Sequence, residues 1–333
     1  MSEAYDYKPA THWAGHDFKD ARASYDSSAK RSYSDAVKNK KTKKDLLAVN
    51  LQTKSSAPLV VIIDVTGSMD DWPGTIFSKL PYLDHELRTE YLGEDSEVCF
   101  AAVGDANNNP QSDEYPLQVR PFTSRDGLKK ALGELVNEHG GGGQTHESYE
   151  LAALYFARQV EMPRAIRPIL IFIGDEQPYD MVDRDQAKNI VGIDLKKGMT
   201  DEQVFTELKA KFEVYLIRKP YQLSRDNTMS DIDRRIYSHW ARLLGDDHIA
   251  DLSDPQRVVD VIFGILAKEA GKIDYFRKEI EERQKPKQVG VVYKSLDTIY
   301  KLSAPETKSL PKKGHSQTHT PLDGKKTKPL LGE

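Results

Sequence analysis

The chain has 333 residues, of which 38% are hydrophobic and 30% charged, and its formal net charge is -4. This length and composition are typical of a globular protein with a sizeable core and charged margins. No apolar stretch approaches the length of a bilayer span, the first residues do not resemble a secretory segment, and the single cysteine, Cys99, fits a reducing compartment. We therefore expect a cytoplasmic protein that does not contact a membrane, and the net negative charge disfavours nucleic acid as its main partner.

Composition divides the chain into three parts. Residues 1–55 are polar and end in a basic run, which predicts a mobile arm or a loosely docked helix. Residues 56–285 alternate β-rich and amphipathic stretches and are expected to form the folded domain. Residues 286–333 are dominated by Lys, Pro, Thr and His, which predicts a disordered tail. The two basic ends leave open a role as an electrostatic tether for nucleic acid or for an acidic protein surface.

The first predicted strand, residues 58–64, has no polar alternation, which indicates burial on both faces. A helical stretch at 72–93 follows, and the strands at 97–106 and 117–122 are joined by turn-forming residues, which favours a hairpin. The remaining predicted elements are helices at 124–139 and 147–160 on either side of a glycine run, strands at 167–175, 212–219 and 246–252, and helices near 201–211, 230–244 and 255–283.

This alternation of strands and helices predicts an α/β fold with a doubly wound, mostly parallel sheet that is covered by helices on both faces. The hairpin adds one antiparallel strand at the edge. Ligands of such sheets bind beyond the carboxyl ends of the strands, near the point where the strand order reverses.

Oxygen-bearing side chains follow two of the predicted strands. Asp64 ends the first strand, and Thr66 and Ser68 follow at alternate positions, while Asp175 ends a later strand. Thr145 lies where the glycine run meets a helix start. We expect these five side chains to converge on one rim of the sheet. Two carboxylates and several hydroxyls are hard oxygen ligands that suit Mg²⁺, with Mn²⁺ or Ca²⁺ as alternatives.

Each of these residues also has a purely structural explanation. Thr66 and Ser68 suit helix N-caps, Thr145 could cap its helix beside Glu147, and Asp175 could be an ordinary loop acid.

Four more acids are candidates for the rim of the site: Asp70, Asp71, Asp105 and Glu176. Asp70 and Asp71 fit best as acids at a helix start, where the helix dipole favours them. Asp105 fits best as a turn residue. The histidines have no spacing typical of zinc ligands.

The stretch DVTGSM and the apolar strand before it resemble a von Willebrand factor type A domain of the intracellular bacterial or phage type, which has a Rossmann-like fold and a metal-ion-dependent adhesion site. The family motif is Asp-x-Ser-x-Ser, and Thr66 takes the middle place here. The resemblance covers about residues 56–270 and assigns the family's second and third motifs to Thr145 and Asp175. QTHES departs from the commoner Gly-Gly-Thr-x-Thr, and IGDEQP departs from Thr-Asp-Gly, which places Glu176 beside the site.

The resemblance implies a metal-dependent protein-binding module in which a carboxylate of a protein partner fills an open coordination position of the ion. Neutral hydroxyl ligands leave positive charge on the ion, so that an incoming acid is attracted. Similar proteins also suggest a second hypothesis, an adaptor or assembly factor that works with an AAA+ ATPase. A scaffold that binds nucleic acid through the basic ends is a third.

Catalysis is the less favoured interpretation. A haloacid-dehalogenase-type phosphotransferase needs a second acid where Thr66 stands, and GGGGQTH lacks the Lys-Ser/Thr ending of a phosphate-binding loop. No nucleophile with an adjacent base is visible either. We therefore expect that the protein is not an enzyme.

Overall fold

The computed structural model describes residues 16–27, 46–107, 115–138, 145–221 and 229–301. The chain divides into two compact units, residues 1–303 and 304–333, and every described residue belongs to the first. The prediction of a disordered tail beyond residue 301 and most of the prediction for the N-terminal arm therefore lie outside the described residues.

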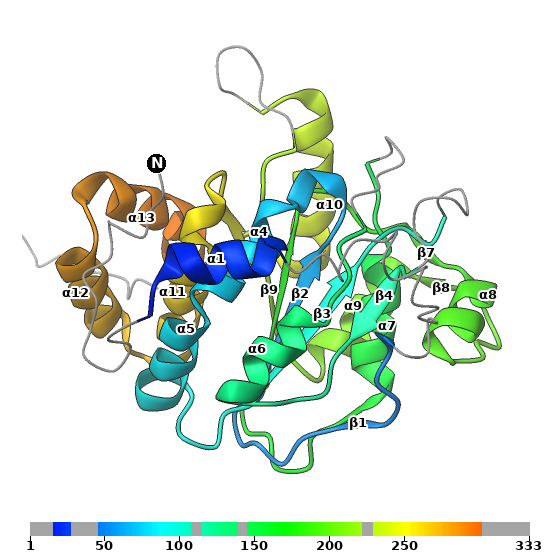
Figure 1. Ribbon diagram of the computed structural model, residues 1–333. Helices are drawn as coiled ribbons and strands as arrows, with labels where there is room; N and C mark the ends of the chain where they lie inside the picture. Colours follow the sequence, from blue (N-terminus) through cyan, green and yellow to red (C-terminus); the bar gives the residue numbers. More distant parts are fainter. Residues whose placement is uncertain (1–15, 28–45, 108–114, 139–144, 222–228, 302–333) are drawn as a thin grey trace, which may run out of the picture. The chain divides into compact units, whose positions relative to one another are not determined.

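A six-stranded sheet, in the order β10-β9-β6-β2-β3-β4, forms the centre of the first unit (Figure 1). Its strands are β2 (Leu59–Asp64), β3 (Val98–Val103), β4 (Leu117–Val119), β6 (Ile169–Gly174), β9 (Glu213–Arg218) and β10 (Ile249–Asp251). All neighbours pair in parallel except β4, which runs antiparallel to β3 at one edge. The prediction of a mostly parallel sheet with one antiparallel edge strand is confirmed.

Successive residues of the central strand face opposite sides of the sheet. Val61 and Ile63 belong to one buried apolar cluster, whereas Val60 and Ile62 belong to a second. Both faces of the strand are fully buried, which explains why its sequence shows no polar alternation.

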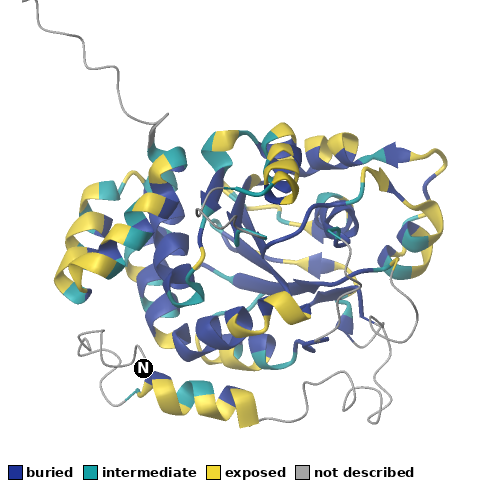
Figure 2. Ribbon diagram, turned by 90° about the horizontal axis from the view of Figure 1, so that it is seen from above, coloured by how far each residue is buried: buried dark blue, intermediate teal, exposed yellow. Residues whose placement is uncertain are grey.

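Helices cover both faces of the sheet, and Figure 2 shows the buried strands between helices whose outer sides are exposed. The first cluster is completed by α4 (Asp71–Ser78), α5 (Leu80–Glu86), α6 (Asp126–Gly133), α11 (Val258–Ala270), α12 (Ile273–Arg283) and α13 (Pro286–Lys301). The second is completed by α7 (Tyr149–Arg158), α9 (Asp201–Lys209) and α10 (Asp231–Leu244). Among the described residues, no helix combines the length and apolarity that crossing a membrane requires.

Short elements connect these helices and strands. They are β1 (Leu51–Gln52), which pairs with β5 (Val160–Glu161), β7 (Met181–Val182), which pairs with β8 (Met199–Thr200), α8 (Arg184–Gln186), the 3-10 turns η4 (Gly67–Met69), η7 (Asp246–His248) and η8 (Pro255–Arg257), and the π-helical turns η5 (Leu87–Tyr91) and η6 (Ala187–Val191).

The C-terminal part of the described chain differs from the sequence-based expectation. Residues 286–301 were assigned to the disordered tail by composition, but they form α13. Its apolar residues recur at helical spacing and are buried in the first cluster: Val289, Val292, Leu296 and Ile299. The Lys-, Pro-, Thr- and His-rich composition belongs to residues 308–333, and extending it back to residue 286 hid this periodicity. The single helix expected at 255–283 is also divided, because Gly271 adopts a left-handed conformation (φ +67°) that ends α11.

A segment of the polar N-terminal region packs on the domain. In α1 (Phe18–Ser27), Phe18 and Tyr25 are buried, and the Tyr25 ring lies 5.0 Å from that of Phe77 on α4. Arg22 of the same helix forms an ion pair of 2.9 Å with Asp71 at the start of α4.

Candidate functional site

The candidate site lies where the strand order reverses. The chain places β3 on one side of β2 and later places β6 on the other, so the carboxyl ends of β2 and β6 lie side by side at the switch point. Asp64 is the last residue of β2, and Asp175 directly follows β6. The fold thus brings together two acids that are far apart in the sequence.

The Asp64 side chain is fully buried and both of its oxygens accept hydrogen bonds. Oδ1 accepts from the backbone N of Thr66 (2.8 Å) and from its Oγ1 (2.6 Å), and Oδ2 accepts from Tyr149 Oη (3.0 Å) at the start of α7. Burial, and after it the negative charge of Asp175, raise the pKa of Asp64 to about 7. A positive charge at this position would therefore be favourable.

Ser68 and Asp175 are joined directly. Ser68 Oγ donates to Asp175 Oδ1 (3.0 Å), and Asp175 is buried. The other carboxylate oxygen accepts from Lys219 Nζ (2.9 Å), and the same ammonium donates to the carbonyl oxygen of Ser68 (2.7 Å). Lys219 directly follows β9, the strand next to β6.

Thr145 lies beside the segment that follows β6. Its carbonyl oxygen accepts from the backbone N of Gln177 (3.1 Å), and its hydroxyl accepts from Arg235 Nη2 (3.4 Å). The hydrogen bonds of the described residues do not connect this hydroxyl to Asp64, Ser68 or Asp175. The glycines that precede Thr145 lie outside the described residues, and its role as a ligand stays a prediction.

The acids proposed for the rim differ in environment. Asp70 and Asp71 are exposed, and Asp71 pairs with Arg22 at the start of α4. Asp105 is buried beyond the end of β3, and its Oδ1 accepts from Tyr179 Oη (3.0 Å).

Glu176 adds a further acid to the buried side of the site. Its backbone carbonyl accepts a hydrogen bond from Trp240 Nε1 (2.8 Å), which holds the segment after β6 against α10. Burial, followed by the charges of Asp64 and Asp175, raises the pKa of Glu176 to about 9. Three acids thus repel one another at this rim.

A second group of side chains could hold a metal ion and was not found from the sequence. Ligand atoms of Asp180, Asp201 and His239 lie within 4.8 Å of one another. His239 Nε2 lies 2.6 Å from Asp201 Oδ2, and Arg242 Nη2 lies 3.0 Å from the same oxygen. A guanidinium thus already neutralises this group. The three residues come from separate elements and no local spacing connects them, which is why this group could not be found from the sequence.

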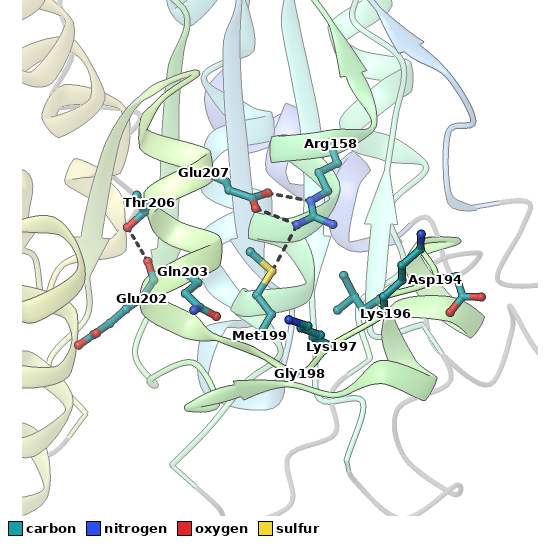
Figure 3. A pocket seen from close by; sticks show the side chains of 11 residues that line it. Arg158, Asp194, Lys196, Lys197, Gly198, Met199, Glu202, Gln203, Thr206 and Glu207 are labelled. Carbon is teal, nitrogen blue, oxygen red and sulfur yellow. Dashed lines mark hydrogen bonds and ion pairs between the residues drawn. The ribbon is translucent and has the colours of Figure 1, made fainter.

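Cavities of the described residues also lie outside the acidic rim. One of about 910 Å³ is lined by α9, the segment before it and Arg158 of α7, and Figure 3 shows Arg158 and Glu207 paired with each other in this lining. Arg158 Nε pairs with Glu207 Oε2 at 2.7 Å, so that these charges satisfy each other. Another, of about 820 Å³, is bordered by His146, Tyr179 and Asp180. Asp64 and Asp175 do not line either of these two cavities.

Comparison with known proteins gives only distant similarities. No family model matches the sequence, and no curated protein matches it significantly. Similar solved structures include the pilus adhesin SpaC from Lactobacillus rhamnosus GG in its open conformation (10% identity, 70% of this chain and 31% of that chain, TM-score 0.45). Another is proximal thread matrix protein 1 from the mussel byssus, with 12% identity over 67% of this chain and 48% of that chain and a TM-score of 0.41. A third is a von Willebrand factor type A protein from Catenulispora acidiphila, with 17% identity over 68% of this chain and 47% of that chain and a TM-score of 0.37.

The chain spans less than half the length of each of these structures. The identities and scores are too low to show a family. What the fold and the site define is a doubly wound α/β domain with an acidic, hydroxyl-containing site at its switch point.

Proposed function

We propose that this chain is a von Willebrand factor type A domain protein that binds a divalent cation at the switch point and captures a carboxylate of a protein partner, without turnover. The observation that carries the proposal is the hydrogen bond of 3.0 Å between Ser68 and Asp175, residues 107 positions apart. It joins the oxygen-bearing loop after β2 to the acid after β6, as the motif resemblance requires.

The donor set fits a hard cation. The carboxylates of Asp64 and Asp175 are both buried, and each is bonded to a hydroxyl of the loop after β2. Oxygen ligands of this kind are those that Mg²⁺ prefers, and Mn²⁺ or Ca²⁺ are alternatives. A bound cation would offset the repulsion between the two acids. In this proposal Asp64, Thr66, Ser68 and Asp175 hold the ion, and Thr145 adds a ligand from the glycine-rich loop.

An acidic group is the partner chemistry that suits this site. Hydroxyl ligands are neutral and add no negative charge beyond that of the two carboxylates, so an open coordination position on the ion can still take an anionic oxygen. The exposed acids Asp70 and Asp71 repel carboxylates that do not reach the ion, which gives the site selectivity for a projecting acidic side chain.

Affinity capture from cell lysate with and without a chelator tests this function. The wild-type protein should recover a partner in Mg²⁺ and lose it with chelator, and Asp64→Ala should not recover it. Asp194→Ala is the matched control, because Asp194 is also an acid but is exposed in an ion pair with Lys188. It should behave as the wild type.

Assays for phosphatase activity and nucleoside-triphosphate hydrolysis should accompany the capture experiment, because they detect turnover. Equal capture by Asp64→Ala and the wild type would contradict the proposal. Metal-dependent turnover that disappears in Asp64→Ala, without any metal-dependent partner, would indicate an enzyme instead.

A further inference from the structure

The ammonium of Lys219 lies inside the proposed cation site. The backbone N of Lys219 donates to the carbonyl oxygen of Gly174 (2.9 Å), which fixes the residue beside the end of β6. From there its Nζ donates to Asp175 Oδ2 and to the carbonyl oxygen of Ser68, and 27% of the side chain is exposed. The side chain is thus positioned at both ends and still reaches solvent.

Both carboxylate oxygens of Asp175, which the divalent cation would need as ligands, already accept hydrogen bonds. One oxygen of Asp175 accepts from Lys219 and the other accepts from Ser68 Oγ. A divalent ion that binds Asp175 and Ser68 must therefore take these oxygens in competition with the ammonium. Two positive charges a few ångströms apart also repel each other, and the burial of Asp64 and Asp175 on the inner side of the site limits the screening of this repulsion by water.

We propose that Lys219 is a tethered counter-ion of the cation site. It neutralises Asp175 when no divalent ion is bound, and it lowers the affinity for that ion, so that loading requires displacement of the ammonium. A lysine suits this role because its compact charge sits on a flexible stem that can swing out to solvent. This inference rests on the proposed function, and it assigns to Lys219 the control of the ion concentration at which the site is loaded.

The test compares Mg²⁺ binding by titration calorimetry in the wild type, Lys219→Met and Lys211→Met. Removal of the charge in Lys219→Met should tighten Mg²⁺ binding about tenfold or more. Lys211→Met is the matched control, because the Lys211 ammonium, before the other end of β9, donates to the carbonyl oxygens of Ala157 and Val160 and, within the described part of the chain, to no carboxylate. Its affinity should equal that of the wild type.

Thermal unfolding gives a second readout. Without a divalent ion, Lys219→Met should melt at a lower temperature than the wild type, because Asp175 then lacks its counter-charge. Addition of Mg²⁺ should raise the melting temperature of Lys219→Met by more than that of the wild type. If Lys219→Met does not fold, Lys219→Gln keeps a hydrogen-bond donor without the charge and has the same expected outcome.

Unchanged, weaker or absent Mg²⁺ binding in the folded Lys219 variant would overturn the role of Lys219. An Asp64→Ala arm separates this result from failure of the proposed function. Equal affinities of the wild type and Lys219→Met, with loss of binding in Asp64→Ala, would reject only the tethered counter-ion. Binding that persists in Asp64→Ala would reject the site itself.

Discussion

Gly174→Ala should destabilise the protein by about 3 kcal/mol, because the position has no room for a side chain. An ideal Cβ at residue 174 would lie 1.8 Å from Tyr149 Oη and 3.3 Å from Asp64 Cβ. The Tyr149 ring cannot move aside easily, since it is fully buried and packs edge-on against Phe172 and Trp240. The substitution should also break the hydrogen bond that holds Asp64 in the site.

Urea unfolding measures this loss of stability. Gly198→Ala is the control, because a Cβ there would meet only Met181, at an ordinary contact distance of 3.4 Å, and it should change the stability by less than about 0.5 kcal/mol. Adding Tyr149→Phe to Gly174→Ala should restore part of the stability, since it removes the closest atom. A Gly174→Ala protein as stable as the wild type would show that Tyr149 is not fixed against Asp64.

Arg218→Met should cost about 3–5 kcal/mol of stability, because it leaves a buried acid without its counter-charge. Arg218, the last residue of β9, and Asp233 of α10 are both fully buried and form an ion pair. Arg218 Nε also pairs with Asp251 Oδ1 at 2.7 Å, at the end of β10. The guanidinium therefore ties two neighbouring strand ends to a helix, directly before Lys219.

The comparison for this variant is Arg158→Met, also measured by urea unfolding. Arg158 pairs with Glu207 at 2.7 Å, but both side chains are partly exposed (36% and 42%), so the loss should be under about 1 kcal/mol. Combining Arg218→Met with Asp233→Asn should recover part of the stability, because the stranded charge is removed. Equal losses of unfolding free energy in Arg218→Met and Arg158→Met would contradict the claim that the buried ion pair of Arg218 with Asp233 stabilises the fold.

The sheet was predictable because its strands are buried on both faces. The run from Leu59 to Ile63 is apolar at every position, and the structure places alternate residues in the two apolar clusters. Helix α13 was not predicted, because the composition of residues 308–333 was extended back to residue 286 and the helical spacing of Val289, Val292 and Leu296 was not considered. The break at Gly271 has a local signal, since glycine readily adopts the positive φ that ends a helix.

The proximity of Asp64 and Asp175 was predictable from the rule that parallel strands end at the same rim. The same rule applied to cations would have indicated Lys219, which is the last residue of a predicted strand. The hydrogen bond from Tyr149 and the group around His239 depend on how helices pack against the sheet, and one sequence carries no local pattern for such contacts.

Mg²⁺ titration of the wild type, Thr66→Ser, Asp64→Ala and His239→Gln tests the central claim most directly. The proposed site predicts that the wild type, Thr66→Ser and His239→Gln bind the ion, because Ser keeps the hydroxyl and His239 belongs to the other group. Asp64→Ala should bind none, because a charged ligand is missing. Binding that persists in Asp64→Ala but disappears in His239→Gln would contradict the claim and place the ion at Asp180, Asp201 and His239.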